Sequence, residues 1–288
     1  MTNLQKWLVE MKTNRELYFS LIGKHNKYLT EYVIKLLLCK VNIFKDFTEL
    51  SLKFDVECKN NEEIIAFSER IEKGEPYQYV LGYAYFLNEE FYVNESVLIP
   101  RQETEQLVLE LIKKMEQLSF QDCLKICDVC TGSGILGIEL KKKYPTSKVY
   151  CSDISKKALD VVKINSLKHK AEVTVLEGDL LSPLLKYAPF DVLVCNPPYI
   201  DNIDGIDPQV LKCEPKEALL AFPGTIFYER IFEQLSLIMK DKFIAGFEIG
   251  ENQKEVLEKK IQSLLPNFEY EFKIDLYNKD RFLFIWKA

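Results

Sequence analysis

Hydrophobic residues recur at helical spacing in the first quarter of the chain. Four apolar residues share one helical face in the opening segment: Leu4, Trp7, Leu8 and Met11. A second run, residues 32–38, follows Thr30, whose hydroxyl suits an N-cap. A third run begins at Asn61 and should end at Gly74, because glycine is favoured just beyond a helix C-terminus. The pattern predicts a small all-helical N-terminal domain over residues 1–75.

The pattern changes to short extended runs over residues 76–100. Aromatic and β-branched residues, which favour strands, dominate the stretch YQYVLGYAYFLNEEFYVNESVLIP. Asn88, Glu89 and Glu90 separate two of these runs and suit a turn. We therefore expect a β-hairpin that links the helical domain to the rest of the chain.

Helical and strand patterns alternate in residues 101–288. The first helix should bury four apolar residues: Leu107, Val108, Leu111 and Ile112. From Leu124 onward, five buried-strand runs are each followed by an amphipathic run or, after the fourth, by a loop: KICDVC, VYCSD, EVTVLEGD, FDVLVC and FIAGFEI. This alternation predicts a parallel sheet with helices on both faces. The last two strand runs are separated only by residues 278–280, too few for a crossover helix, so they should pair antiparallel.

The expected fold class is therefore α/β. It has a seven-stranded, mainly parallel sheet with an antiparallel C-terminal hairpin, preceded by the small helical domain. This sheet is the architecture of the Rossmann-like methyltransferases.

Length and composition agree with two folded domains. At 288 residues, the chain exceeds the size at which a single core usually divides. Hydrophobic residues make up 47% and charged residues 28%, which is too apolar for disorder. The N-terminal residues show no apolar run typical of a signal peptide, and no apolar span is long enough for a membrane helix. We expect a cytoplasmic protein that does not associate with membranes.

The charge distribution argues against a nucleic-acid partner. The net charge is −6, and residues 1–75 carry 12 Lys and Arg against 12 Asp and Glu, which leaves 26 against 32 for residues 76–288. Proteins that hold a duplex by its phosphates usually show a basic excess. Neither part of the chain has one, so we expect no direct contact with nucleic acid.

Three of the eight cysteines have a spacing that radical enzymes use to hold an iron-sulfur cluster. Cys123, Cys127 and Cys130 form the pattern C-x3-C-x2-C. The segment LKICDVC is typical of a buried strand, in which Cys127 and Cys130 would point to opposite faces and could not converge on one cluster. The two histidines, His25 and His169, are distant in sequence. We therefore expect reduced cysteines and no metal site.

Two glycines follow the first buried strand, where a bound ligand requires close approach of the backbone. The strand leads into a helix through the sequence Asp128-Val129-Cys130-Thr131-Gly132-Ser133-Gly134. This arrangement is typical of a nucleotide-cofactor loop and makes Thr131, Gly132, Ser133 and Gly134 candidate cofactor-binding residues. Cys130 replaces the first glycine of the dinucleotide pattern G-x-G-x-x-G, so a pyrophosphate is not clearly indicated. The alternative is an ordinary tight turn.

Carboxylates end the next two strands. Asp153 follows the second strand, where it can accept both hydroxyls of a ribose; its alternative role is to cap the helix that starts at Ser155. Asp179 ends the third strand beside Leu180, where it can accept from an adenine amino group. Ligands bind at the carboxyl ends of strands in open α/β sheets, so Asp153, Asp179 and Leu180 are candidate cofactor-binding residues.

The most specific motif is Asn196-Pro197-Pro198-Tyr199, directly after the fourth strand. The side-chain oxygen of Asn196 and the backbone carbonyl of Pro197 are two acceptors that can hold both hydrogens of an NH2 group. Consecutive prolines keep these acceptors rigid, and Tyr199 offers a flat face beside them. We predict that Asn196, Pro197 and Tyr199 are catalytic, that all four residues bind substrate, and that Asn196 also contacts the cofactor. A simple turn after the strand is the alternative.

These motifs together resemble the release factor glutamine methyltransferases of the HemK type. The matching stretches, in the family's order, are GEPYQYVLGYAYF, VLIPRQETEQLV, ICDVCTGSGILGIEL, NPPYI, CEPKEALLAFPG, EIGENQ and KDRFLFIW. They cover residues 74–287, whereas the helical segment before them matches only in size and helicity. Gln102 stands where the family commonly has proline, and Cys130 where it often has glycine.

The resemblance implies a reaction and a partner. The expected cofactor is S-adenosylmethionine, with S-adenosylhomocysteine as product, and the expected substrate is the glutamine amide in the Gly-Gly-Gln motif of a peptide-chain release factor. Residues 1–75 would recognise the substrate and residues 101–288 would carry the chemistry. The alternatives are a ribosomal-protein glutamine methyltransferase, a DNA adenine-N6 methyltransferase that acts on a flipped base, a nucleotide-binding oxidoreductase and a non-catalytic cofactor-binding protein.

Overall fold

The computed structural model describes residues 13–24, 26–121, 123–204 and 206–288. The chain divides into two compact units, Met1–Tyr83 and Ala84–Ala288. The helical face expected in the opening segment, at Leu4, Trp7, Leu8 and Met11, lies outside the described residues. Within the described ranges, every helix is too short or too polar to span a bilayer.

The described part of the first unit consists mainly of helices joined by turns. Its helices are α2 (Asn14–Ile22), α3 (Glu31–Asn42), α4 (Phe47–Leu52), α5 (Asn61–Glu72) and α6 (Tyr77–Leu81). Thr30 caps α3 by accepting from the backbone N–H of Val33, as predicted. The predicted start of α5 at Asn61 is also confirmed, and the chain leaves this helix through Gly74, which has φ 93°. Apolar side chains from these helices form a core of their own.

The segment after α5 differs from its prediction. We expected extended structure throughout residues 76–100, but Tyr77–Leu81 forms the single turn of α6. Pro76 stands at its N-cap, and Gly82 ends it with φ 74°, a left-handed conformation that glycine adopts without strain. Pro76 and Gly82, which favour the start and the end of a helix, therefore outweigh the strand preference of the aromatic and β-branched residues between them.

The hairpin exists, but its turn lies earlier than predicted. It joins β1 (Tyr83–Phe86) to β2 (Glu89–Tyr92) through Leu87 and Asn88, which have φ 48° and 65°. Two consecutive residues with positive φ match the twist of paired strands, which favours this tight connection. Glu89 and Glu90 consequently belong to β2 and not to the turn.

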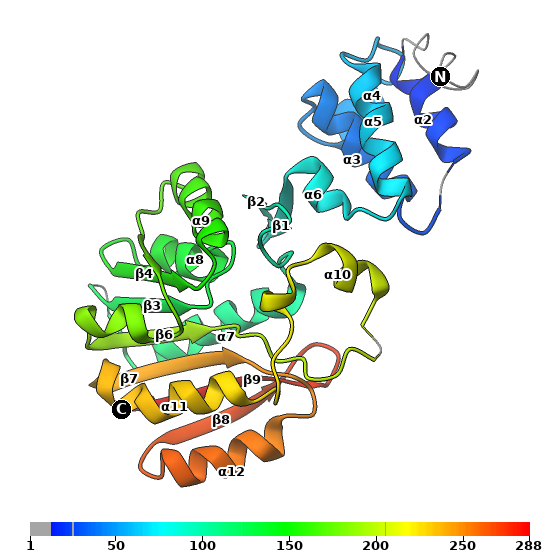
Figure 1. Ribbon diagram of the computed structural model, residues 1–288. Helices are drawn as coiled ribbons and strands as arrows, with labels where there is room; N and C mark the ends of the chain where they lie inside the picture. Colours follow the sequence, from blue (N-terminus) through cyan, green and yellow to red (C-terminus); the bar gives the residue numbers. More distant parts are fainter. Residues whose placement is uncertain (1–12, 25, 122, 205) are drawn as a thin grey trace. The chain divides into compact units, whose positions relative to one another are not determined.

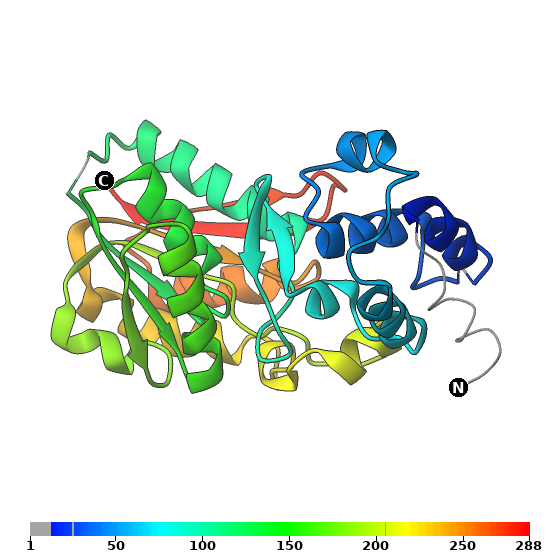
Figure 2. The ribbon, with the colours of Figure 1, turned by 90° about the horizontal axis from the view of Figure 1, so that it is seen from above.

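The second unit contains the predicted seven-stranded sheet (Figures 1 and 2). Its strands are β3 (Lys125–Val129), β4 (Lys148–Asp153), β5 (Thr174–Glu177), β6 (Phe190–Cys195), β7 (Met239–Glu248), β8 (Glu269–Ile274) and β9 (Asp280–Lys287). They lie in the order β5-β4-β3-β6-β7-β9-β8. The first five are parallel, and β9 runs antiparallel between β7 and β8. The predicted fold class is confirmed.

Helices cover both faces of this sheet. One face packs against α7 (Gln102–Gln117), α8 (Ile135–Lys143) and α9 (Lys156–Lys168), and the other against the 3-10 helix η1 (Ser182–Tyr187), α11 (Ile226–Ile238) and α12 (Lys254–Leu264). On β3, Ile126 contributes to the first layer, whereas Cys127 and Val129 contribute to the second. Alternate residues of one strand thus build two separate cores.

The connection between β6 and β7 is more structured than predicted. We expected a loop, but the chain forms α10 (Pro208–Cys213), the 3-10 helix η2 (Lys216–Ala218) and α11. Four buried residues on α11 recur at helical spacing: Tyr228, Ile231, Phe232 and Leu235. The signal for α11 was therefore present in the sequence.

Helix α8 lies unusually close to the sheet. A Cβ atom added to Gly137 would come within 2.6 Å of the Cys151 sulfur and 3.1 Å of Asp128 Oδ2. Only glycine allows this approach, which brings the start of α8 over the carboxyl ends of β3 and β4. The loop between β3 and α8 is held in place by this packing.

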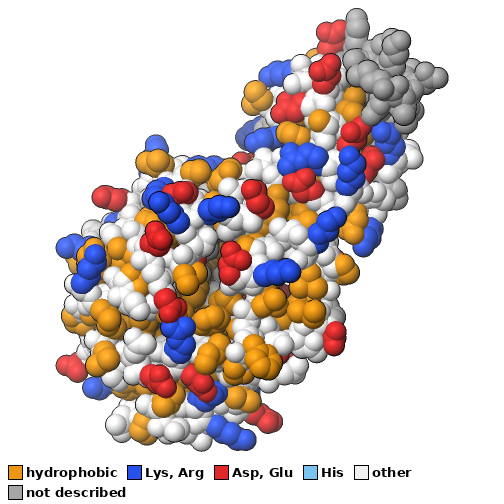
Figure 3. Space-filling model, in the orientation of Figure 1, with side chains coloured by type: hydrophobic (Ala, Val, Ile, Leu, Met, Phe, Trp, Pro, Cys, Tyr) orange, Lys and Arg blue, Asp and Glu red, His pale blue; other side chains and the backbone are white. Residues whose placement is uncertain are grey.

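Charged side chains of both signs are interspersed on the face of the molecule shown in Figure 3. Many form ion pairs, such as Lys142 with Glu89 and Glu139, and Lys273 with Glu110. On this face, as in the sequence, neither sign of charge dominates.

Candidate active site

A cavity of about 310 Å³ opens at the carboxyl edge of the parallel strands. Its walls include eight of the predicted site residues: Thr131, Gly132, Ser133, Asp153, Asp179, Leu180, Asn196 and Pro198. Apolar side chains complete the walls, among them Ile135, Leu136, Ala158 and Phe227. The remaining predicted residues, Gly134, Pro197 and Tyr199, adjoin lining residues in sequence but are not part of the lining.

The buried carboxylate of Asp128 holds the loop between β3 and α8. Gly132 and Gly134 have φ 54° and 82°, so both use the left-handed region that favours glycine. Asp128 Oδ2 accepts from Thr131 Oγ1 and, over 2.9 Å, from the backbone N–H of Gly137. Asp128 is fully buried, and sequence reasoning assigned it no role. It thereby ties Thr131 of the loop to Gly137 of α8.

Burial raises the pKa of Asp128 to about 7, although its bonds from Thr131 and Gly137 favour the charged form. One of its oxygens, Oδ1, has no hydrogen-bond partner among the described residues. The buried charge is therefore incompletely compensated.

Asp153 has a structural function in addition to its place in the cavity wall. Its Oδ2 accepts from the backbone N–H of Gly132 and its Oδ1 from that of Ser155, each over 2.9 Å. The N-cap of α9 is Ser155, which accepts from Ala158 N, so Asp153 is not the cap itself. Burial raises the pKa of Asp153, whereas these backbone N–H groups lower it. The carboxylate is thus held in one orientation at the end of β4.

Asp179 lies two residues beyond the end of β5 instead of ending that strand. It lines the cavity and forms an ion pair with Arg230 of α11. Leu180 follows with φ 46° and is buried. The turn places the Asp179 carboxylate and the Leu180 side chain on the same wall.

The NPPY motif leaves β6 directly into the cavity wall. Asn196 Nδ2 donates to Thr104 Oγ1 over 3.3 Å. The Tyr199 hydroxyl donates to Glu248 Oε1 over 3.1 Å, and Tyr199 O accepts from Gln253 Nε2 over 3.0 Å. Tyr199 therefore packs against the hydrophobic core next to the motif. We expected its ring to line the cavity, but it does not.

Three further polar residues near the motif escaped sequence reasoning. Thr104 lines the cavity and hydrogen-bonds to both Asn196 and Glu248, and Glu214 joins two segments that border the cavity. Glu214 has only 2% of its side chain exposed; its Oε1 contacts Arg101 Nη2 over 2.5 Å and its Oε2 accepts from Ile99 N over 3.0 Å. Glu214 and Glu248 stand in matched family stretches, CEPKEALLAFPG and EIGENQ, which was the available signal.

The cysteines after Leu124 do not follow simple strand alternation. Cys127 and Cys130 were expected on opposite faces, but both contribute to the same core layer. Strand β3 ends at Val129, and Cys130 has φ 56°, which turns its side chain back. Among the described residues, no group of three or more His, Cys, Asp and Glu side chains is arranged to hold a metal ion.

The family model for the methyltransferase small domain matches residues 105–212. A release factor glutamine methyltransferase from Bacillus cereus is 40% identical over 226 residues, which cover 76% of this chain and 80% of that protein. One from Bacillus subtilis is 37% identical, covering 76% and 79%. One from Clostridium acetobutylicum is 32% identical, covering 87% and 85%.

Solved structures with a similar fold are also methyltransferases. The 16S rRNA N2 G1207 methyltransferase of Thermus thermophilus, solved with AdoMet and guanosine, aligns with a TM-score of 0.52 at 16% identity, covering 72% of this chain and 50% of that one. The ribosomal protein L11 methylase of Lactobacillus delbrueckii aligns with a TM-score of 0.50 at 20% identity, covering 68% and 84%. At these identities the likeness concerns the fold alone.

The incompletely compensated charge of Asp128 should make stability depend on pH. Its pKa is higher in the folded chain than the 3.8 of an ordinary aspartate, so the folded state binds more protons between about pH 4 and pH 7. The contribution of Asp128 is thus fully present below pH 4 and is lost as pH rises to 7, at up to about 1.4 kcal/mol per pH unit. Asp128→Asn removes this slope.

Urea unfolding of both proteins at several pH values measures the effect. The free energy of unfolding of the parent should fall relative to that of Asp128→Asn as pH rises from 4 to 7, and the difference should be constant above 7. A difference that stays constant across the whole range would contradict a raised pKa for Asp128.

Proposed function

The chain belongs to the release factor glutamine methyltransferase family, and we propose that it methylates the side-chain amide nitrogen of the glutamine in the Gly-Gly-Gln motif of a peptide-chain release factor. The relatives' names support the substrate class. The structural observation that carries the proposal is the position of Asn196, which lines the same cavity as Gly132 and Asp153. An acceptor for an NH2 group thus borders the candidate cofactor pocket.

The cavity residues fit S-adenosylmethionine as the methyl donor. This cofactor would supply an electrophilic methyl group on a sulfonium and leave as S-adenosylhomocysteine. Asp153 would accept the ribose hydroxyls, Asp179 would accept from the adenine amino group, and Leu180 would contact the adenine ring. A Cβ added at Gly132 would meet nothing within 4 Å, so open space lies in front of this backbone. Thr131, Ser133 and Gly134 would complete the loop around the cofactor.

The NPPY motif would promote methyl transfer by orienting the substrate amide. An amide nitrogen is a poor nucleophile because its lone pair is delocalised. Asn196 Oδ1 and the Pro197 carbonyl would accept its two hydrogens and turn the lone pair toward the methyl carbon. These acceptors would also stabilise the positive charge that develops on nitrogen as the new N–C bond forms and the S–C bond of the donor breaks. The methylated nitrogen would then lose one of its two protons to solvent. Buried Pro197 and Pro198 keep the acceptors in place before substrate arrives.

Tyr199 would contribute by holding this motif in place. Its hydroxyl is bound to Glu248 and its ring packs on the core below the cavity. Contact between the ring and the substrate, which the sequence suggested, is not required for this function.

The first unit would recognise the protein substrate. The whole cavity lining comes from the second unit, so the helical unit contributes none of the cavity wall. Four large hydrophobic side chains among the described residues of this unit are more than half exposed: Phe19, Ile43, Leu52 and Val56. Such side chains suit contact with another protein.

Methyl transfer to separate substrate pools tests the function. We expect labelled S-adenosylmethionine to label a release factor, and substitution of its Gly-Gly-Gln glutamine by alanine to abolish the label. Ribosomal proteins and DNA serve as competing pools. Label on either of these pools, with none on the release factor, would contradict the proposal.

Variants of Asn196 test the mechanism. Asn196→Ala removes one positioned acceptor and should lower turnover by roughly 10²- to 10³-fold, with little change in affinity for S-adenosylhomocysteine. Asn196→Asp keeps the shape but adds a charge near a sulfonium whose positive charge disappears during transfer, so it should favour the ground state over the transition state. Turnover should fall here too. Parent turnover in either folded variant would show that Asn196 is structural.

A fragment of residues 84–288 tests the role of the helical unit. It contains the full cavity lining and should bind S-adenosylhomocysteine as the whole chain does. We expect it to methylate a short Gly-Gly-Gln peptide but to lose most activity on the whole release factor. Equal activity of fragment and whole chain on the release factor would show that residues 1–83 do not recognise it.

A further inference from the structure

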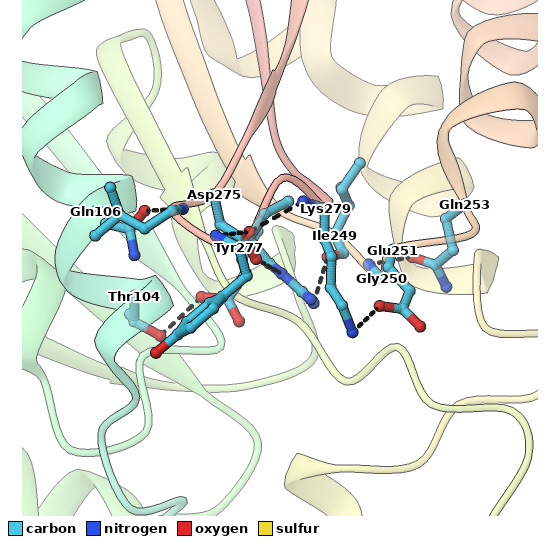
Figure 4. Close-up of polar contacts among 12 residues, drawn as sticks. Thr104, Gln106, Ile249, Gly250, Glu251, Gln253, Asp275, Tyr277 and Lys279 are labelled. Carbon is cyan, nitrogen blue, oxygen red and sulfur yellow. Dashed lines mark hydrogen bonds and ion pairs between the residues drawn. The ribbon is translucent and has the colours of Figure 1, made fainter. Parts of the chain in front are cut away.

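Thr104 and Glu248 form a hydrogen-bonded pair next to Asn196, and Thr104 lines the same cavity as Asn196. Thr104 lies in the first turn of α7, Glu248 ends β7 and Asn196 follows β6, which is the parallel neighbour of β7. Thr104 Oγ1 donates to Glu248 Oε2 over 2.7 Å; Figure 4 shows this bond of Thr104. Asn196 Nδ2 lies 3.3 Å from the same Thr104 oxygen. The three side chains therefore form one continuous chain of hydrogen bonds.

The direction of each hydrogen bond follows from the number of hydrogens available. An ionised carboxylate can only accept, and a threonine hydroxyl has a single hydrogen to donate. Because Thr104 donates that hydrogen to Glu248, it can offer only a lone pair to Asn196. The Asn196 amide must then turn its NH2 group toward Thr104, which leaves its oxygen on the opposite side.

Both oxygens of Glu248 accept hydrogen bonds, one from the Thr104 hydroxyl and the other from the Tyr199 hydroxyl. The residue is only 2% exposed, and this burial raises the pKa of Glu248 overall. The two hydroxyls and the positive charge of Arg281 oppose the rise, because they favour the charged carboxylate. Arg281 is itself fixed by Asp275 and by the Ile249 carbonyl, each over 3.2 Å. Figure 4 shows the turn around Asp275 that holds this cation.

We propose that Glu248, acting through Thr104, fixes the side-chain amide of Asn196 with its oxygen toward the cavity and so prepares the site to hold a substrate NH2 group. Glu248 and Thr104 are positioning residues, since neither needs to touch the reacting atoms. The inference rests on the proposed function for its consequence in catalysis. A reversed Asn196 amide would point its own NH2 group at the substrate NH2 group, and two donors repel each other.

Two replacements of Thr104 distinguish the contribution of its hydroxyl group from that of its packing. Thr104→Val keeps the shape but removes the link between Glu248 and Asn196, so kcat on the release factor should fall by about 10- to 100-fold. Affinity for S-adenosylhomocysteine should change by less than about twofold, because the loss lies in orientation and not in ground-state binding. Thr104→Ser restores the hydroxyl and should recover most of the loss. Thr174→Val, an exposed threonine-to-valine change on β5, is the matched control and should leave kcat unchanged.

Combination with Asn196→Ala tests whether Thr104 acts through Asn196. When Asn196 is already absent, Thr104→Val should lower kcat by no more than about a further twofold, because coupled residues are not additive. Loss by the same factor in both backgrounds would overturn the proposal, since Thr104 would then act independently of Asn196. Glu248→Leu should likewise lower kcat by no more than about a further twofold when Thr104→Val is already present. If Glu248→Leu does not fold, the Thr104 variants alone still test the proposal.

The orientation of Asn196 can also be read without any methyl transfer. The ¹⁵N-¹H signal of its side-chain NH2 group is identified by its loss in Asn196→Ala. This signal should shift in Thr104→Val and return toward the parent position in Thr104→Ser. An unchanged signal in Thr104→Val would overturn the proposed relay even if the parent methylates the release factor. A shifted signal in a chain that methylates no release factor would instead contradict the proposed function alone.

Discussion

The buried carboxylate of Glu248 joins the two segments on which the candidate active site depends. One oxygen binds Thr104 at the start of α7, and the other binds Tyr199 of the NPPY motif. The motif follows β6, and Glu248 ends the neighbouring strand β7. The backbone pairing of these two strands is therefore enough to place the motif beside Glu248. A buried carboxylate is stable only when donors satisfy it, which commits both segments to one arrangement.

The same principle recurs around the cavity. Asp128 holds the loop after β3 to α8, Asp153 holds that loop to the end of β4, and Glu214 holds the segment before α7 to the segment after α10. Each carboxylate accepts from backbone or side-chain donors of separate segments. These bonds constrain the polar edge of the cavity, as a reaction that relies on orientation requires.

The sheet and the motifs were predictable because their signals are local. Continuous apolar runs identify β3, β4 and β6 as buried strands, and Asp153 and Asn196 stand directly at or after their ends. The hairpin turn was predicted too late in the chain, and the reason is also local. The turn is formed by Leu87 and Asn88, both with positive φ, and the apolar Leu87 is not a residue that signals a turn. Helix α11 was missed although its apolar spacing was visible.

The positioning residues could not be predicted, because their partners are distant in sequence. Thr104 and Glu248 are 144 residues apart, and Arg101 and Glu214 are 113 apart. Only the folded sheet shows which polar residues become neighbours.

The central claim is that Asn196 and Pro197 hold the substrate amide through its two hydrogens. A crystal structure of the chain with S-adenosylhomocysteine and a Gly-Gly-Gln peptide tests it most directly. The account predicts that the glutamine Nε2 lies about 3 Å from both Asn196 Oδ1 and the Pro197 carbonyl oxygen, with Asn196 Nδ2 still on Thr104. A glutamine side chain bound elsewhere, or one whose carbonyl oxygen faces Asn196, would contradict it.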